Sequence, residues 1–221
     1  PVAKKICCNF PETLSMLPKE KAVLTGSPIR DELTKGDKIS ALDLCNFTVN
    51  KPVILVIGGS LGAASVNKVV REALPKLLND FQIVHICGKD KIDNMFLHME
   101  GYIQFEYVKN ELKDLFAMAD IVVSRAGANS ICELLALKKP NLLVPLSANS
   151  SRGDQILNAK SFESQGFSMV IDDDYLSADL LTEKVTELYF TRQTYIDAMG
   201  KSNQLNSIKT IMNLIEDASC A

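Results

Sequence analysis

From residue 52 onward, short apolar runs alternate with segments in which apolar residues recur every three or four positions. Each run has the length of a buried strand and is apolar at nearly every position rather than at every second one. Strands of this kind are typical of a parallel sheet that is covered by helices on both faces. The pattern therefore predicts an α/β fold with a doubly wound parallel sheet, with strands in the runs 52–59, 81–88, 102–108, 120–127, 141–147 and 168–173.

Helices are predicted between these runs and after them. The clearest apolar face lies in residues 66–78, and the same spacing recurs in 112–119 and 131–135. A further helix is expected to begin near residue 154. The C-terminal stretch predicts a last helix, which needs a surface to cover, with one apolar face made of Leu205, Ile208, Ile211, Met212 and Ile215.

The first forty residues do not fit the main sheet. "KKICCNF" and "KAVLTGSPIR" predict two short strands, and the polar stretch "DELTKGDKIS" predicts a linker. The chain begins with Pro1 rather than Met, inside what looks like a continuing element. We therefore expect a fragment whose upstream part is missing.

Charge and composition exclude several classes of protein. The chain has 24 basic and 27 acidic residues and a net charge of −3, without long blocks of either sign, which argues against a nucleic-acid partner. No apolar run reaches the roughly 20 residues that span a bilayer, and no signal peptide is evident, so a cytosolic protein is expected. The six cysteines form no C-x-x-C pair and only two histidines are present, so no metal site is predicted and the thiols are expected to be reduced core residues.

Two strand-to-helix turns carry the candidate chemistry, because ligands of doubly wound sheets bind outside the carboxyl ends of the strands. In the first, "IGGSLGAASVNK", Gly59 and Ser60 follow a strand, and glycines there let a phosphate approach the backbone N–H groups of the next helix. The spacing is not the G-x-G-x-x-G of dinucleotide-binding proteins. By itself this turn is as well explained by tight packing.

The second turn is "SRAGANSICE". Gly127 and Ala128 keep it small, and Asn129 or Ser130 is expected to cap the helix. Glu133 then either bonds back to the cap in a capping box or binds a ligand, and the residues alone leave these two roles equal. A third polar segment, "SANSSRGDQILNAKSF", follows the next strand. Together the three strand ends favour a polyhydroxylated, anionic ligand.

Four stretches resemble, in order and spacing, successive motifs of the MurG family of GT-B glycosyltransferases (family 28). They are "LTGSPIR", "VIGGSLGAASVN", "ADIVVSRAGANSICELLALKKPNLLVPL" and "SRGDQILNAKSF". The resemblance runs from about residue 5 to at least residue 173 and covers the donor-binding C-terminal half, which is Rossmann-like. It implies an inverting hexosyltransferase that moves N-acetylglucosamine from UDP-N-acetylglucosamine to undecaprenyl-linked lipid I, giving lipid II in peptidoglycan synthesis, with no cofactor.

The resemblance also implies a role for individual residues. Arg30 and Ser60, with Gly59 beside it, would face the diphosphate, and the backbone of Val108 would read uracil. The helix start in 127–130 would meet phosphate, Glu133 would hold the ribose hydroxyls, and the pair Asp154 and Gln155 would meet the sugar. Three positions depart from the family pattern: Ser27, Asn129 and Asp154. Asn129 and Asp154 would lie beside the transferred sugar, which leaves the identity of the hexose open.

The family's N-terminal acceptor domain, which carries the histidine near the reaction centre, has no counterpart in this sequence. The expected division is therefore 1–33 as the end of a missing acceptor domain plus linker, 34–204 as the UDP-sugar-binding domain, and 205–221 as a helix that packs on this or the missing domain. No catalytic base is expected in the chain. The resemblance places the protein on the cytoplasmic side of the bacterial membrane, as a peripheral protein that contacts the membrane only through the missing domain.

Other interpretations keep the same sheet. A lipid glycosyltransferase of the same family with another acceptor, such as diacylglycerol, would look alike in this half. A separate nucleotide-sugar-binding subunit that needs a partner chain is a second alternative. A Rossmann-like domain of unrelated purpose is disfavoured because four motifs agree in order.

Overall fold

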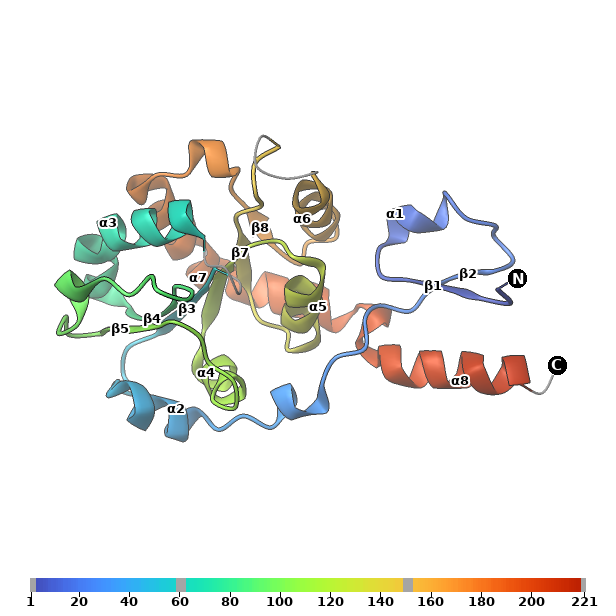
Figure 1. Ribbon diagram of the computed structural model, residues 1–221, viewed down its shortest axis with the longest axis horizontal. Coiled ribbons are helices and arrows are strands. Elements are labelled where there is room, and N and C mark those ends of the chain that lie inside the picture. The colour runs from blue at the N-terminus through green and yellow to red at the C-terminus, as the bar shows by residue number, and fades with distance from the viewer. Residues whose placement is uncertain (1–2, 59–62, 149–152, 220–221) are drawn as a thin grey trace.

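The computed structural model describes residues 3–58, 63–148 and 153–219 of the chain. Its centre is a six-stranded parallel sheet in the order β5-β4-β3-β6-β7-β8 (Figure 1). Every strand lies within a predicted run, so the predicted doubly wound parallel sheet is confirmed. The strands are β3 (Val53–Ile57), β4 (Gln82–Ile86), β5 (Tyr102–Phe105), β6 (Ile121–Ser124), β7 (Asn141–Leu143) and β8 (Met169–Val170).

The strand order reverses between β3 and β6. The chain runs outward from β3 through β4 to β5, and then returns to place β6 against the other side of β3. Ile57 pairs with Ser124 in this ladder, so the two strands end side by side. The crevice outside the carboxyl ends at such a reversal is the usual ligand site of doubly wound sheets. The two turns predicted to carry the chemistry therefore begin next to each other.

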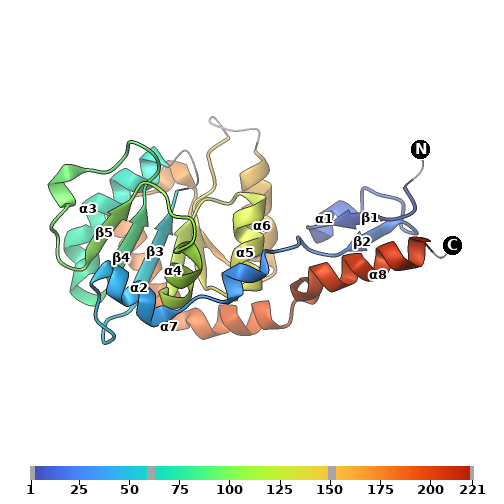
Figure 2. The same cartoon turned by 60° about the horizontal axis from the view of Figure 1, so that its bottom comes forward.

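Helices cover both faces of the sheet (Figure 2). Because side chains alternate along a strand, Leu55 of β3 belongs to one core and its neighbour Ile54 to the other. The first core also holds side chains of α2 (Lys38–Cys45), α4 (Leu112–Met118), α5 (Ala128–Ala136) and α6 (Asp154–Ser164). The second holds side chains of α3 (Ala64–Asp80) and of the first half of α7 (Ala178–Gly200).

Residues 31–40, predicted to be an irregular polar connection, contain regular structure. This stretch contains the 3₁₀ turn η1 (Asp31–Thr34) and the first residues of α2. The side chain of Asp37 accepts a hydrogen bond from Ser40 N at 2.8 Å and so caps α2. Leu33 is buried in the core, which fixes η1 against α4. Polar composition therefore concealed two short elements that each bury few apolar residues.

The two predicted N-terminal strands are confirmed, and they pair with each other in a separate two-stranded parallel sheet. It consists of β1 (Ile6–Cys8) and β2 (Ala22–Leu24), with α1 (Pro11–Leu14) between them. This sheet lies beside α8 (Ser207–Ser219), away from the main sheet (Figure 2), and Lys4 Nζ donates to Ala218 O at 2.6 Å. On α8, Ile208, Met212 and Ile215 are each about half exposed. The predicted helix is confirmed, and the surface that its apolar face covers stays a prediction.

The buried cysteines and His85 are structural residues of the core. Cys8, Cys45, Cys87 and Cys132 are buried, which confirms the prediction for these four thiols, whereas Cys7 is exposed and Cys220 lies outside the described residues. In β4, His85 is fully buried between Tyr102 Oη at 2.8 Å and Asn67 Oδ1 at 2.9 Å. Burial, aided by nearby Arg71, lowers the pKa of His85 to about 3, so the ring is neutral and structural.

Three further 3₁₀ turns complete the described chain: η2 (Asn94–Phe96), η3 (Asp173–Tyr175) and η4 (Asn203–Asn206). Among the helices in the described ranges, none is long and apolar enough to cross a membrane.

Candidate functional site

Three helices begin at the carboxyl edge of the sheet without a side-chain cap. They are α3, α5 and α6, whose N-cap residues are Ala63, Gly127 and Gly153. By contrast, Asp37 caps α2 and Ser177 caps α7. The first N–H groups of a helix have no partner within the helix, and together with the helix dipole they attract anions. The edge that holds the strand reversal is therefore suited to a negatively charged group.

The predicted cap of α5 is wrong. Asn129 and Ser130 are the second and third residues of the helix, and the N-cap is Gly127, which has no capping side chain. Glu133 is the sixth residue, beyond the third helical position that a capping box requires. The structure therefore removes the capping role that the sequence left open for Glu133.

The described residues give no structural reason for glycine at position 127. Its backbone has φ −67° and ψ 135°, a conformation that every residue adopts. Of the residues that the structure describes, an added Cβ atom would meet only Ser130 Oγ, at 3.9 Å. Within those residues neither turn geometry nor packing demands glycine, which makes the α5 N-terminus a candidate for close approach by a ligand.

Glu133 contacts Arg30, which lies 103 residues earlier in the sequence. Arg30 Nη2 is 3.4 Å from Glu133 Oε1. The Glu133 side chain is 21% exposed and that of Arg30 is 65% exposed. Burial raises the pKa of Glu133 from its ordinary value, and the Arg30 cation opposes this effect. A pair this exposed contributes little to stability, so both groups remain available to a ligand.

Arg30 also lines a cavity that reaches Val108. Its volume is about 590 Å³, within the range of small-molecule sites. Val108 follows β5, and its side chain packs on the first core. The lining residues are Arg30, Glu32, Leu33, Val108, Lys109, Asn110, Leu112 and Lys113. Three of these side chains are cationic and one is a carboxylate, so the cavity suits an anionic ligand.

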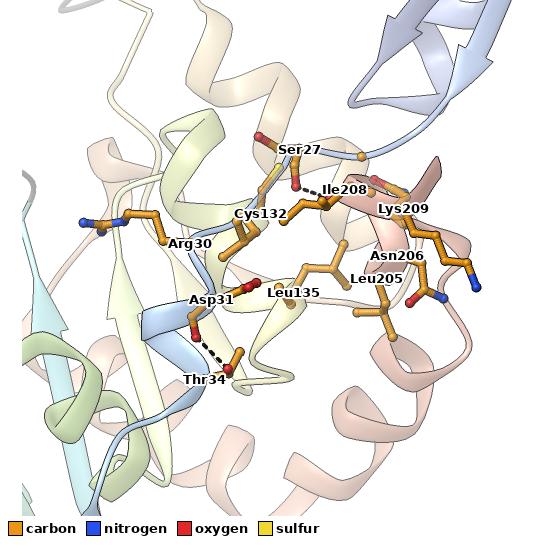
Figure 3. Close-up of a pocket in the computed structure, with 15 residues that line it drawn as sticks. Ser27, Arg30, Asp31, Thr34, Cys132, Leu135, Leu205, Asn206, Ile208 and Lys209 are labelled. Atoms are coloured by element: carbon orange, nitrogen blue, oxygen red, sulfur yellow. Dashed lines mark hydrogen bonds between the residues drawn. The ribbon is translucent and has the colours of Figure 1, made fainter. Parts of the chain in front are cut away.

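A second cavity lies on the other side of the 26–34 segment. It has a volume of about 370 Å³ and is enclosed by this segment, α5 and the start of α8 (Figure 3). The Arg30 guanidinium points away from it. Its floor is largely apolar, with Leu135 and Leu205 beneath a polar rim. Because of the cationic side chains around it, the Val108 cavity is the better match for a nucleoside diphosphate.

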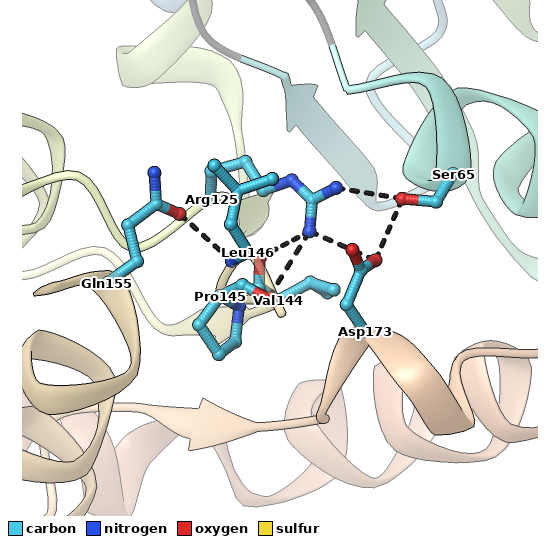
Figure 4. A network of polar contacts seen from close by, with 7 residues as sticks. All are labelled: Ser65, Arg125, Val144, Pro145, Leu146, Gln155 and Asp173. Carbon is cyan, nitrogen blue, oxygen red and sulfur yellow. Dashed lines mark hydrogen bonds and ion pairs between the residues drawn. The ribbon is translucent and has the colours of Figure 1, made fainter. Parts of the chain in front are cut away.

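Gln155 lies at the third strand end, in the first turn of α6. Its Oε1 accepts a hydrogen bond from Leu146 N at 3.1 Å (Figure 4). Because the amide oxygen is used in this way, the amide nitrogen is the end that can donate to a sugar hydroxyl. Asp154, the preceding residue, is exposed at the helix start.

Arg125, for which the sequence predicts no role, is buried at this edge. Arg125 is 8% exposed, and Nη1 lies 3.0 Å from Asp173 Oδ1 while Nη2 donates to Ser65 Oγ at 2.8 Å (Figure 4). The signal was present in the sequence, since a charged residue at the end of an apolar strand must be paired when it is buried. Its partner on η3 is 48 positions away and could not be identified without the fold.

The predicted site residues thus fall into three groups. The structure brings Arg30 and Glu133 together, and Arg30 and Val108 share a cavity. The α5 start (127–130) and the α6 start lie at neighbouring strand ends of the same edge, after β6 and β7. Gly59 and Ser60 lie outside the described residues.

These features define the chain as a Rossmann-like domain with a crevice at its carboxyl edge that is suited to an anion. Residues 53–215 match the model of the glycosyltransferase family 28 C-terminal domain, and the chain belongs to this family. Its fold is that of the C-terminal half of a GT-B glycosyltransferase.

Curated relatives carry one shared name, UDP-N-acetylglucosamine--N-acetylmuramyl-(pentapeptide) pyrophosphoryl-undecaprenol N-acetylglucosamine transferase. The protein of this name from Lachnospira eligens is 62% identical over 217 residues, and that from Clostridium novyi is 54% identical over 217 residues. In both cases the match covers 98% of this chain and 61% of the relative. The chain therefore spans about three fifths of the length of these relatives.

Solved structures agree on the fold. The MurG of Acinetobacter baumannii superposes with a TM-score of 0.72 at 24% identity, covering 98% of this chain and 61% of that one. The UDP-GlcNAc 2-epimerase of Neisseria meningitidis, solved with UDP-GlcNAc bound, gives a TM-score of 0.65 at 15% identity, covering 97% of this chain and 61% of the epimerase. At these identities the likeness concerns the fold alone.

Proposed function

We propose that this chain binds UDP-N-acetylglucosamine as the donor half of an inverting transferase that converts lipid I to lipid II. The observation that carries the proposal is the meeting of Arg30 and Glu133 beside the uncapped start of α5, at the strand reversal of a family 28 domain. The name shared by the relatives supplies the donor and the acceptor.

Each part of the donor has a matching group. Arg30 and the N–H groups that begin α5 bind the diphosphate, together with the 59–60 turn. The Glu133 carboxylate accepts hydrogen bonds from the ribose hydroxyls, and the Val108 backbone holds uracil in the cavity that it shares with Arg30. The amide nitrogen of Gln155 donates to the sugar. Asn129 and Asp154 lie beside the same sugar and influence which hexose is accepted.

The chemical contribution of this half is to stabilise the departing UDP. In an inverting transfer the acceptor hydroxyl attacks the anomeric carbon while the bond to the diphosphate breaks, so negative charge develops on UDP. A cation and oriented N–H groups in fixed positions stabilise that charge without reorganisation. The base that takes the hydroxyl proton belongs to an acceptor domain outside this chain.

The wider assignment follows from the same family. Residues 1–33 are the end of the acceptor domain plus linker, from which Arg30 reaches the donor site. Residues 34–204 form the UDP-sugar-binding domain, and the helix in 205–221 packs on this domain or on the acceptor domain. The acceptor domain binds undecaprenyl-linked lipid I and places the protein on the cytoplasmic side of the bacterial membrane. An enzyme with a diacylglycerol acceptor and a separate subunit with a partner chain are the alternatives, and acceptor assays with a chain of the relatives' full length distinguish all three.

The chain should bind UDP and UDP-N-acetylglucosamine but transfer no sugar. The chain carries every residue proposed to bind the donor, whereas it neither positions nor activates the acceptor, and general-base assistance alone contributes about 10²–10⁴ in rate. Calorimetry with both ligands, and release of UDP from the donor in the presence of lipid I, measure the two parts. Failure to bind UDP would refute the donor role. Sugar transfer by this chain alone would refute the proposal that the reaction requires the acceptor domain.

A further inference from the structure

We propose that Arg125 is a positioning residue for the diphosphate, acting through Ser65 and Asp173. The inference rests on the proposed donor site and adds a set of residues that do not themselves touch the donor. It concerns how the helix starts at the carboxyl edge are held at a fixed distance from one another.

The guanidinium of Arg125 joins four parts of the fold. Arg125 itself follows β6 and directly precedes the turn into α5. Its Nη1 donates to Val144 O at 3.0 Å and to Pro145 O at 3.4 Å, both after β7. Nη1 also lies 3.0 Å from Asp173 Oδ1 of η3, and Nη2 donates to Ser65 Oγ, in the first turn of α3, at 2.8 Å. The planar guanidinium reaches these partners at once because its N–H groups diverge in a fixed fork, and the two hydrogens of Nη1 are shared among its three acceptors.

Ser65 closes this arrangement. Its hydroxyl accepts from Arg125 and donates to Asp173 Oδ1 at 2.8 Å, so the start of α3 is bonded to both members of the ion pair (Figure 4). The Arg125 and Asp173 side chains are only 9% and 12% exposed. The members of a buried charge pair have no solvent to replace a lost partner, so moving one away from the other is costly. The position of the α3 start is therefore fixed relative to the α5 start.

The same contacts reach the third helix start. The segment 144–146 is held on one side by Arg125 and on the other by Gln155 of α6, through Leu146 N. One side chain thus orients all three helix N-termini that surround the proposed diphosphate. The Val108 cavity, proposed for uracil, has no lining residue from this set.

The test compares affinities for UDP and uridine in Ser65→Ala, Ser65→Thr and Arg125→Lys. Ser65→Ala should weaken UDP binding about tenfold, because small misplacements of binding groups are costly, and leave uridine binding within about twofold. Ser65→Thr keeps the hydroxyl and should restore UDP affinity. Arg125→Lys keeps the charge but not the fork, and should resemble Ser65→Ala.

Asp120→Asn is the matched control. The Asp120 carboxylate accepts from Val53 N at 2.8 Å at the opposite edge of the same strands, so this substitution changes a charge far from the proposed diphosphate while keeping an acceptor oxygen. The ratio of UDP to uridine affinity should stay unchanged in this variant. Equal weakening of both ligands by Ser65→Ala and Arg125→Lys, or equal behaviour of Ser65→Ala and Ser65→Thr, would overturn the positioning role while leaving the donor site intact. Loss of UDP binding in the unaltered chain would overturn both proposals.

Discussion

Gly127→Val should reduce UDP affinity about 100-fold while the free energy of unfolding changes by only about 1 kcal/mol. The backbone of Gly127 is already in a region open to valine, and an added Cβ has space around it. The fold therefore tolerates the change, apart from a small loss at the N-cap. A phosphate oxygen that must reach the first N–H groups of α5 meets the new methyl groups, and forcing such an overlap costs about 3 kcal/mol.

Uridine separates this effect from general damage. Uridine lacks the phosphates and relies on the Val108 cavity and Glu133, so its affinity should change by less than about threefold. Ala128→Leu, which adds bulk one residue further into α5, should behave in the same way. Calorimetric titration with UDP and with uridine, together with denaturant unfolding, measures the three quantities. Equal weakening of UDP and uridine would place the diphosphate elsewhere.

The parallel sheet could be predicted from the sequence because its strands are buried on both faces. In the run 120–127 the strand is apolar at consecutive positions up to Ser124, and such runs alternating with helices are typical of a covered parallel sheet. The helix α7 escaped prediction for the opposite reason: over 23 residues it buries only Leu181, Val185, Leu188 and Met199, so its apolar spacing is weak. The α2 helix was hidden in a polar stretch.

The candidate site could be predicted only where the strand ends carried the signal. Gly127 and Ala128 stand out as small residues between a strand and a helix, and the sheet order shows that the three parallel strands before these turns end at one edge. The cap on Asn129 or Ser130 failed because the helix begins earlier than residue spacing indicates. The Arg125 to Asp173 pair joins elements whose proximity depends on the order of the strands, which no local pattern encodes.

The raised pKa of Glu133 indicates that its carboxylate is not retained for stability. An acid whose folded pKa lies above its unfolded value binds protons more tightly when folded, so its ionised form opposes folding above that pKa. Glu133→Gln should therefore leave the unfolding free energy at neutral pH unchanged or slightly higher. A side chain in α5 that opposes folding when ionised, and that contacts Arg30, is better explained by a ligand that needs the charge.

Glu133→Gln should accordingly weaken both uridine and UDP by about 1–3 kcal/mol, the cost of unsatisfied polar groups in a buried contact. Ribose hydroxyls donate to the ionised carboxylate, so uridine affinity of the unaltered chain should fall as the pH is lowered through the raised pKa of Glu133. The Glu133→Gln variant should show a flat profile between about pH 8 and about pH 4, because an amide does not titrate.

Arg30→Ala provides the contrasting pattern. It removes a phosphate partner but no ribose contact, so at about pH 8 it should weaken UDP, with a reduced dependence on salt, and leave uridine nearly unchanged. Without the cation the pKa of Glu133 should rise further, which moves the acid limb of the uridine profile to higher pH. The two substitutions therefore distinguish the two parts of UDP, because Glu133 binds the ribose and Arg30 binds the diphosphate. Identical losses of uridine in both variants would show instead that the Arg30 to Glu133 pair acts as one structural unit.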